Sequence, residues 1–272
     1  MPTTGESIRL SRLFSGGQNA VIVAIDHGLY FGPLPGMEDL SKTVKSLSGA
    51  DAILMAPGAA AHCASVFTQR GSPAMILRLN FASNYLSIWN YSHSHSVPMI
   101  SVGGAVALGA DHVLASLTLQ NPDQGEDARN VELLSHYVNE KRALGIPMIG
   151  EVFPTGGDDA NPKDLYELVR VGCRIVAELG VDLVKTFYTG ENFSKITSST
   201  PIPILALGAK KTRYEKDALR LAAEAVHAGA RGVVFGRNVI QAREPERFLD
   251  ALKEVVKTDA DPDMVAVKFK LD

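Results

Sequence analysis

Long apolar runs are absent from this sequence, and none approaches the ~20 residues that a helix needs to cross a bilayer. The amino terminus also lacks an apolar stretch followed by small residues, which is the pattern of a secretory signal. Cysteine is scarce: Cys63 and Cys173 stand alone, without CxxC spacing, which argues against a disulfide framework and a cysteine-based metal centre. These absences predict a cytoplasmic protein with no membrane partner.

A strong excess of charge of one sign is missing too. The 272 residues include 27 Lys and Arg against 30 Asp and Glu, a formal net charge of -3. This balance argues against nucleic acid as a partner, although a local basic pocket for a small anion remains compatible with it. No repeat, low-complexity tract or Pro/Ser linker divides the chain. We therefore expect one domain over residues 1–272, with an extension at about 1–19 and a tail at about 257–272.

The sequence does contain a regular alternation of short apolar runs and longer amphipathic segments. The apolar runs predict buried strands at Val21–Asp26, Asp51–Ala56, Ala74–Leu79, Asp111–Leu117, Pro147–Phe153, Val181–Lys185, Ile202–Ala206 and Gly232–Phe235. The amphipathic segments predict helices at Met37–Leu47, Ala59–Gln69, Gly125–Leu144, Pro162–Leu179, Tyr214–Ala228 and Val239–Val256. About eight such strand-helix units in one domain are the pattern of a TIM (β/α)8 barrel, with a doubly wound open sheet as the alternative.

Charged residues occur where several of these strands end. Asp26, Arg78, Glu151 and Lys185 all stand near the carboxyl end of a predicted strand, which is where TIM barrels place their chemistry. Lys185 follows the apolar run Val181–Val184, so burial without a carboxylate partner would lower its pKa and leave an amine that attacks a carbonyl. The alternatives are a lysine that snorkels to solvent or one half of a buried ion pair.

Two carboxylates are candidates to act with this lysine. Asp26 either orients Lys185 and moves protons, or is a turn residue before Gly28. Glu151 lies within an apolar strand, where an unpaired carboxylate is costly. It therefore either pairs with a cation such as Arg78 or Lys185, or acts as an acid or base with a raised pKa.

The last two predicted strands both end in glycine just before a helix. Their ends read Leu207-Gly208-Ala209-Lys210-Lys211 and Gly236-Arg237-Asn238. In TIM barrels the loops after strands seven and eight commonly bind phosphate, because glycine lets the backbone approach and a helix N-terminus offers free N–H groups. Arg237 would add a bidentate cation. The alternative is a pair of turn glycines beside a surface arginine.

Residues 80–96 are polar and aromatic and include Trp89, His93 and His95. We expect a loop over a site or an interface. The two histidines suggest a metal pair, but their polar setting favours ordinary surface or interface histidines, so no metal and no cofactor is predicted. The tail contains VAVKFKL and is expected to pack on a partner subunit or to fray.

Four segments together resemble the DeoC/LacD aldolases. They read AIDHGLYFGPLPG (24–36), VDLVKTFYTG (181–190), ILALGAKK (204–211) and GVVFGRNVIQ (232–241). The branch concerned joins archaeal-type class I fructose-bisphosphate aldolase, 2-amino-3,7-dideoxyheptulosonate synthase and autoinducer-2-phosphate thiolase. The resemblance implies a (β/α)8 barrel, a homo-oligomer that is often a decamer, a Schiff-base lysine at Lys185, an active site with Asp26 and His27, and a phosphate site with Gly208, Gly236 and Arg237.

Some positions depart from the pattern of this family. A tyrosine that donates and accepts protons usually follows the fifth strand in a YPRG-like stretch, and Phe153 stands there instead. Ala209 replaces the second of two paired phosphate-loop glycines, and Arg78 is similar to the thiolase branch. Proton transfer is therefore expected from Glu151, Tyr188 or a water held by Asp26.

The sequence thus predicts a class I, metal-independent aldolase that acts on a phosphorylated ketose with a donor of the dihydroxyacetone phosphate type. Catalysis is expected at Lys185, Asp26, His27, Glu151 and Tyr188, and substrate or phosphate binding at Arg78, Gly208, Ala209, Gly236 and Arg237. The alternatives are a transaldolase-like synthase, a thiolase for a phosphorylated diketone, and a phosphosugar-binding barrel that has lost its proton shuttle. The expected partner in each case is a small phosphorylated carbonyl compound.

Overall fold

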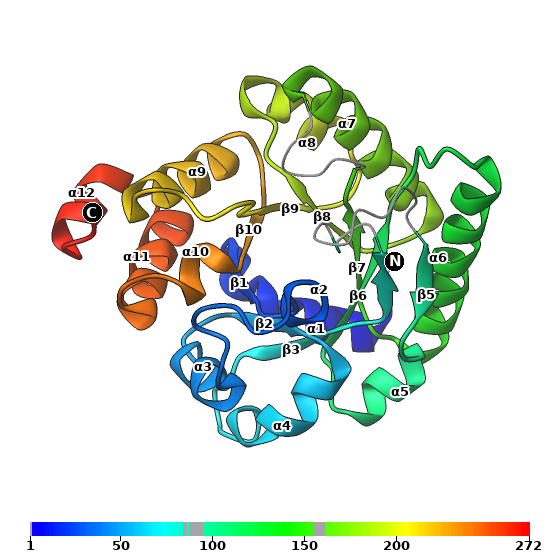
Figure 1. Ribbon diagram of the computed structural model, residues 1–272, viewed down its shortest axis with the longest axis horizontal. Coiled ribbons are helices and arrows are strands. Elements are labelled where there is room, and N and C mark those ends of the chain that lie inside the picture. Colours follow the sequence, from blue (N-terminus) through cyan, green and yellow to red (C-terminus); the bar gives the residue numbers. More distant parts are fainter. Residues whose placement is uncertain (1, 84–85, 87–94, 155–160) are drawn as a thin grey trace.

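The computed structural model describes residues 2–83, 86, 95–154 and 161–272. Within them, eight parallel strands form a closed barrel in the order β1-β10-β9-β8-β7-β6-β3-β2 (Figure 1). The strands are β1 Ala20–Ala24, β2 Ala52–Met55, β3 Ala74–Arg78, β6 His112–Leu117, β7 Met148–Val152, β8 Leu183–Phe187, β9 Ile204–Leu207 and β10 Gly232–Phe235. The prediction of a TIM barrel is confirmed, and the doubly wound open sheet is wrong.

Most of the helices surround this barrel on its outside (Figure 1). The helices are α1 Thr4–Leu13, α2 Gly28–Phe31, α3 Leu40–Ser46, α4 Pro57–Phe67, α5 Val102–Ala107, α6 Gln124–Leu144, α7 Pro162–Leu179, α8 Phe193–Ser199, α9 Glu215–His227, α10 Arg237–Ile240, α11 Pro245–Thr258 and α12 Pro262–Lys268. Single 3₁₀ turns lie at Ser15–Gly17 and Gly190–Asn192. In the part of the chain that the structure describes, no helix is both long and apolar enough to span a membrane.

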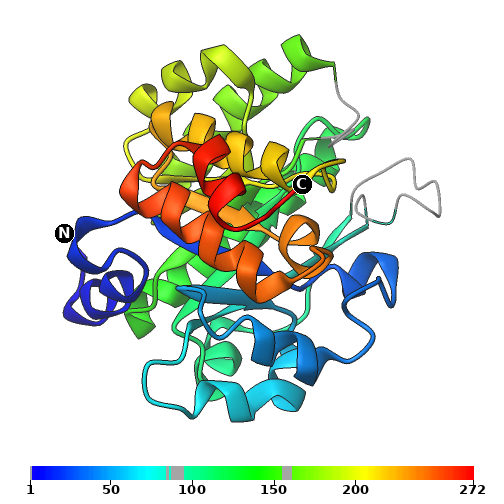
Figure 2. The same ribbon diagram turned by 90° about the vertical axis from the view of Figure 1, so that its left-hand side faces the viewer.

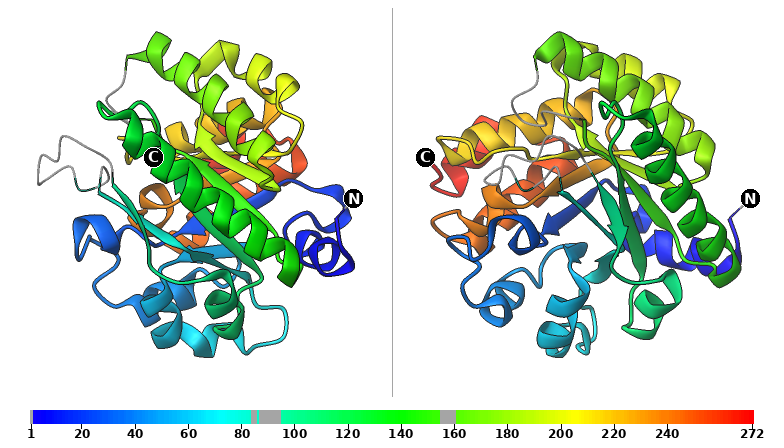
Figure 3. Two further views of the ribbon diagram at one scale, coloured as in Figure 1. Left: turned by 90° about the vertical axis from the view of Figure 1, so that its right-hand side faces the viewer. Right: turned by 45° about the vertical axis from the view of Figure 1, so that its right-hand side comes forward.

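Alternation along the strands divides the apolar side chains into two layers. Residues such as Ile22, Leu54 and Leu183 fill the interior of the barrel. Their neighbours in sequence, such as Val21 and Val184, pack outward against the helices. Figure 3 shows α6 and α7 against the outer side of β6 and β7. The direction of any strand side chain therefore follows from its position relative to these interior residues.

Two parts of the segment 80–96, for which we expected a loop, form strands. The segments Asn80–Ala82 (β4) and Ser96–Pro98 (β5) form a two-stranded antiparallel sheet with Phe81 opposite Val97. His95 lies with its Nε2 3.3 Å from Glu126 Oε1 of α6. Trp89 and His93 lie outside the described residues.

The predicted helix Val239–Val256 is in fact two helices, α10 and α11. Pro245 occupies the first turn of α11, and Glu244 before it has extended backbone angles. A residue that precedes proline is sterically disfavoured from the helical region. Pro245 therefore ends any helix that arrives from α10 and starts a new one.

The two ends of the chain occupy different parts of the molecule. Helix α1 lies at the amino end of the strands, where Leu13 joins the interior apolar cluster, and α2 lies at the opposite end of the barrel (Figures 2 and 3). Helix α12 packs against α9 and α11 (Figure 2), and the backbone N–H of Lys216 donates to Asp272 O at 2.9 Å. The expectation that the tail frays is wrong, because it folds back on its own chain.

Candidate active site

Five polar side chains continue the inward-facing rows of the barrel at its carboxyl end. Each stands two residues after an interior apolar residue: Asp26 after Ala24, Arg78 after Ile76, Ser116 after Leu114, Glu151 after Ile149 and Lys185 after Leu183. A strand repeats its direction every second residue, so all five point into the mouth of the barrel. All five are buried. The sequence prediction that charged residues gather at this end is confirmed.

Lys185 is half of a buried ion pair with Glu151. The two residues are directly opposite each other in the register of β7 and β8, and Lys185 Nζ lies 2.5 Å from Glu151 Oε1. Lys185 is 6% exposed and Glu151 is 2% exposed. The lysine therefore has a carboxylate partner. The expected fall of its pKa applied only to a lysine buried without such a partner.

Arg78 binds the second oxygen of the same carboxylate. Its Nη2 donates to Glu151 Oε2 at 2.7 Å, its Nε donates to Asp26 Oδ2 at 2.5 Å, and its Nη1 donates to Ser116 Oγ at 2.5 Å. The sequence grouped Arg78 with the phosphate-binding residues. The structure instead places this guanidinium deep in the barrel, between two carboxylates and against the ring of Tyr30 at 5.7 Å.

The two carboxylates of this network are held ionised. Burial acts to raise the pKa of Glu151, but the charges of Arg78 and Lys185 outweigh burial and keep that pKa far below its usual range. The same balance lowers the pKa of Asp26, with burial opposed by Arg78 and then Lys185. Of the two expectations for Glu151, pairing with a cation is confirmed, and a raised pKa is wrong in the free protein.

The loops after β9 and β10 lie together at the next two strands of the barrel. Arg237 Nη2 donates to Ala209 O at 2.8 Å and so connects the two loops. Ala209 has a φ of 50°, in the left-handed region that the second glycine of the family pattern would adopt with less strain. The glycine loops predicted from the sequence thus form one contiguous feature beside Lys185.

Asn238 fastens these loops to each other, and its role was missed at the sequence level. Its Nδ2 donates to Gly208 O at 2.8 Å, and its Oδ1 accepts from Thr212 N at 2.8 Å. The side chain is buried. The only signal in the sequence is its position after Gly236-Arg237, since an amide can both donate to and accept from a neighbouring backbone.

His27 lies between the loop after β10 and the ion network. Its Nδ1 lies 3.9 Å from Asp26 Oδ1, and burial lowers the pKa of His27 to about 4, against the opposing effect of Asp26. A Cβ on Gly236 would lie 2.2 Å from His27 Cε1. Glycine is therefore required at position 236 because the imidazole packs directly on its backbone.

Tyr188 lies outside the ion network. Its ring packs edge-on against Phe193 at 5.3 Å, and burial, followed by the charge of Glu224 on α9, raises its pKa. The structure thus does not bring Tyr188 together with Asp26 and Glu151. Its catalytic role remains a prediction from the sequence.

Tyr30 on α2 also lies at the mouth of the barrel, and it was not predicted there from the sequence. It is buried, its ring stacks on Phe81 at 5.3 Å, and burial raises its pKa to about 12. Its place four residues after Asp26, in a segment that follows a strand, was the available signal.

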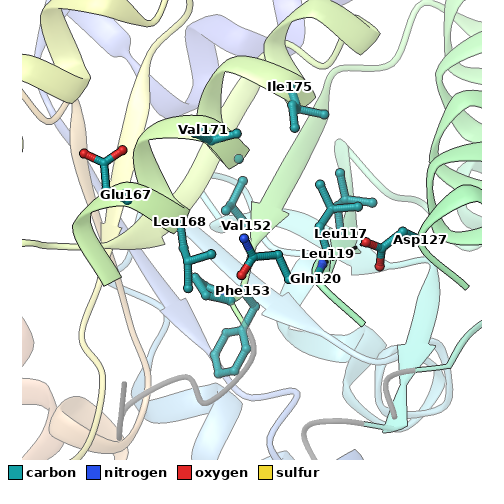
Figure 4. Close-up of a pocket in the computed structure, with 12 residues that line it drawn as sticks. Leu117, Leu119, Gln120, Asp127, Val152, Phe153, Glu167, Leu168, Val171 and Ile175 are labelled. Carbon is teal, nitrogen blue, oxygen red and sulfur yellow. Dashed lines mark hydrogen bonds between the residues drawn. The ribbon is translucent and has the colours of Figure 1, made fainter. Parts of the chain in front are cut away.

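Phe153 contributes an apolar ring to the β6 and β7 side of the mouth. Its ring lies 5.1 Å from that of Phe187. Behind it a cavity of about 310 Å³ opens between β6, β7 and α7, where Phe153 lies with Leu168 and Gln120 (Figure 4). Within the described ranges, His, Cys, Asp and Glu form no group of three or more that could hold a metal ion.

The fold and this mouth define a TIM-barrel protein with a lysine and its carboxylate partner at the catalytic end. Residues 20–242 match the family model of the DeoC/LacD family aldolases, and the chain belongs to this family. An uncharacterized aldolase of Saccharolobus solfataricus is 34% identical over 262 residues, which cover 94% of this chain and 96% of that protein. The 3-hydroxy-5-phosphonooxypentane-2,4-dione thiolase of Yersinia pestis is 30% identical over 254 residues, 93% of this chain and 82% of the thiolase.

Solved structures of fructose-1,6-bisphosphate aldolases share the fold. One Schiff-base-forming enzyme superposes with a TM-score of 0.79 at 30% identity, covering 92% of this chain and 99% of its own. An archaeal enzyme whose catalytic lysine is covalently bound to a carbinolamine intermediate superposes with a TM-score of 0.78 at 30% identity and the same coverage.

Proposed function

We propose that this protein is a class I aldolase that forms a Schiff base between Lys185 and a phosphorylated ketose of the dihydroxyacetone phosphate type. The observation that carries the proposal is the position of the Lys185 amine. It is buried at the barrel mouth 2.5 Å from a carboxylate oxygen of Glu151, one strand away from the loop of Gly208 and two strands away from that of Gly236. The carbinolamine seen in the archaeal relative is in keeping with it.

The reaction begins with proton transfer from Lys185 to Glu151 Oε1. The neutral amine then adds to the carbonyl carbon, Glu151 returns the proton to the departing hydroxyl, and the loss of water leaves a protonated imine beside the ionised carboxylate. This imine accepts the electron pair of the neighbouring carbon-carbon bond as that bond breaks, so an enamine forms and an aldehyde leaves. The hydroxyl proton of the leaving carbon passes to Glu151 or to a water held by Asp26.

Glu151 is the group we assign in place of the family tyrosine that is missing at Phe153. In the resting network two cations keep it ionised. When Lys185 passes on its proton, Arg78 is the one cation of this pair that still lies beside Glu151. The pKa of Glu151 therefore rises toward its usual range. While the amine is neutral, the absence of this one neighbouring charge thus allows Glu151 to hold the proton until water leaves.

Borohydride reduction in the presence of dihydroxyacetone phosphate tests the nucleophile. We expect a mass increase at Lys185, and we expect Lys185→Arg, which retains the positive charge beside Glu151, to lose the adduct and at least ~10³-fold in rate. Lys195→Met on exposed α8 is the matched control and should react as the unaltered protein does. An adduct at another lysine, or turnover without any adduct, would overturn the proposal. EDTA should leave the rate unchanged, since the imine mechanism needs no metal.

A second candidate is acyl transfer from a phosphorylated diketone to coenzyme A. The observations in its favour are the phenylalanine at position 153 and the 30% identity to the Yersinia pestis thiolase. A screen that supplies either an aldehyde acceptor or coenzyme A, read by mass spectrometry of the phosphate esters, separates the two reactions. The homo-oligomer expected from the resemblance, which is often a decamer in this family, remains a prediction that light scattering would test.

A further inference from the structure

Basic residues are distributed unevenly around the mouth. In the sequence, eight segments run from the end of a barrel strand to the first residue of the next outer helix, and Lys and Arg occur only in those after β9 and β10. These residues are Lys210, Lys211, Arg213 and Arg237. The other segments contain no Lys or Arg, and the one after β7 contains Asp158 and Asp159. The mouth therefore offers cations to a bound anion on one side.

The two cations inside the barrel are not available for a second anion. Arg78 donates to Asp26, Ser116 and Glu151, and Lys185 pairs with Glu151 and is the proposed nucleophile. Two carboxylates and two cations make the network neutral as a whole. An additional anion near it would meet no net positive charge.

The side of the mouth farthest from Arg237 is built from apolar side chains. Phe153 and Phe187 are in ring contact there. The cavity behind Phe153 is lined by leucine, valine and isoleucine side chains and by the carboxylates of Asp127 and Glu167 (Figure 4). Gln120 after β6 is an exposed polar residue of this side. Among the residues that the structure describes, a phosphate dianion placed here would lose water without gaining charge-assisted hydrogen bonds from Lys or Arg.

We propose that the enzyme acts on substrates that carry a single phosphate, and that the part of the carbon chain beyond the cleaved bond is uncharged and lies on the β6 and β7 side. The phosphate is held by the loops after β9 and β10. This inference rests on the proposed aldolase function and narrows its substrate class. It separates the chain from an enzyme that cleaves sugar bisphosphates between two phosphate sites.

The test compares two acceptors that differ only by a phosphate. With dihydroxyacetone phosphate as donor, kcat/KM is measured for glyceraldehyde and for glyceraldehyde 3-phosphate. We expect the unphosphorylated aldehyde to be preferred by at least ~10-fold. An equal or higher kcat/KM with the phosphorylated aldehyde overturns the proposal. Borohydride trapping of dihydroxyacetone phosphate alone is measured in parallel, and its absence would instead refute the aldolase function itself.

A charged variant tests where the acceptor lies. Gln120→Arg places a cation beside Phe153, and we expect it to raise the relative kcat/KM of the phosphorylated aldehyde by ~10-fold while trapping of the donor stays unchanged. Gln120→Met has a similar length without charge and should leave the ratio as it is. A ratio that does not move in Gln120→Arg, in a variant that still traps the donor, overturns the placement on the β6 and β7 side.

Discussion

Each oxygen of the Glu151 carboxylate has its own cation. Lys185 lies on Oε1 and Arg78 on Oε2, while Ser116 adds a hydrogen bond to Oε2. Oε1 can therefore take part in proton transfer while Arg78 and Ser116 hold Oε2 in place. Asp26 fixes the far side of Arg78 and so determines where that guanidinium lies.

Glu151→Gln is the most informative single change in this network. The amide keeps the shape but removes the negative charge, so we expect kcat to fall by ~10²–10⁴-fold because the proton acceptor is lost. The two buried cations would be left with Asp26 as their one carboxylate partner in the network, and the free energy of unfolding should fall by about 3 kcal/mol. Rates from pre-steady-state kinetics and urea denaturation measure the two effects.

Ser116→Ala is the matched control for that change. It removes a hydrogen bond to Oε2 but leaves the carboxylate and both cations, so we expect a loss of about 1 kcal/mol and a rate within ~10-fold of the unaltered protein. A Glu151→Gln enzyme that turns over as fast as Ser116→Ala would show that another group moves the proton.

At this scale the sequence was informative about the direction of side chains and gave their partners only as alternatives. The period of two along a strand was enough to place Arg78, Glu151 and Lys185 at the mouth. Which carboxylate meets which cation depends on the register between β7 and β8, and that register is fixed by closure of the whole barrel. Ser116, a small neutral residue in a buried strand, carried no signal of its own.

At the scale of elements, the proposed phosphate site is an assembly of two loops and one short helix. Asn238 is the first residue after Arg237 in α10, and its side chain holds the backbone of the β9 loop at Gly208 and Thr212. Neither loop alone presents the complete set of backbone groups. The relative position of the two loops depends on the side-chain amide of Asn238, which need not contact the ligand.

Asn238→Ala should separate the loops without touching the ion network. We expect a loss of about 1–3 kcal/mol of stability, because buried backbone groups lose their partners. KM for the phosphorylated donor should rise by ~10-fold or more with little change in kcat, as measured by steady-state kinetics. An unchanged KM would mean that the loops keep their arrangement without this side chain.

The elements themselves were largely predictable, because apolar runs and helix periodicity reflect local burial. The helix break at Pro245 has a local cause, the proline itself, which is visible in the sequence. The helix prediction rested on periodicity alone and therefore missed this break. The pairing of Asn80–Ala82 with Ser96–Pro98 was not predictable, since short polar strands lack a buried face that would mark them. Contacts between distant loops, such as that of Asn238 with Thr212, leave no periodic trace.

At the scale of the whole molecule, two histidines are held neutral at opposite ends of the barrel. His27 follows β1 at the carboxyl end, and His112 begins β6 at the amino end. Burial lowers the pKa of His112 to about 3, with the charges of Arg9 and Arg12 on α1 acting in the same direction. Folding therefore opposes protonation of both side chains.

The free energy of unfolding should accordingly fall as the solution becomes acidic. An unfolded histidine binds a proton below its reference pKa of about 6.5, whereas His112 in the folded protein does so only near 3, so stability is complete above pH 7 and is lost as pH falls from about 6.5 toward 3. At pH 5 the loss from His112 is about 2 kcal/mol. His27 should contribute less, because its side chain is 18% exposed.

His112→Gln isolates this effect, since an amide does not titrate. Urea denaturation at pH 5 and pH 8 should show a smaller difference in the variant by about 2 kcal/mol, whatever its absolute stability. The same pH dependence in both proteins would indicate that His112 is protonated as readily in the fold as in the unfolded chain.

The neutral network around Lys185 has one more consequence, for the charge that the reaction creates. A protonated imine carries the same single positive charge as the ammonium from which it derives, and it lies at nearly the same place. The carboxylate 2.5 Å from Lys185 Nζ therefore already balances the intermediate before any substrate arrives. The resting protein thus already presents to the proposed iminium the charges that it presents to the ammonium, and its dipoles need not turn when that iminium forms.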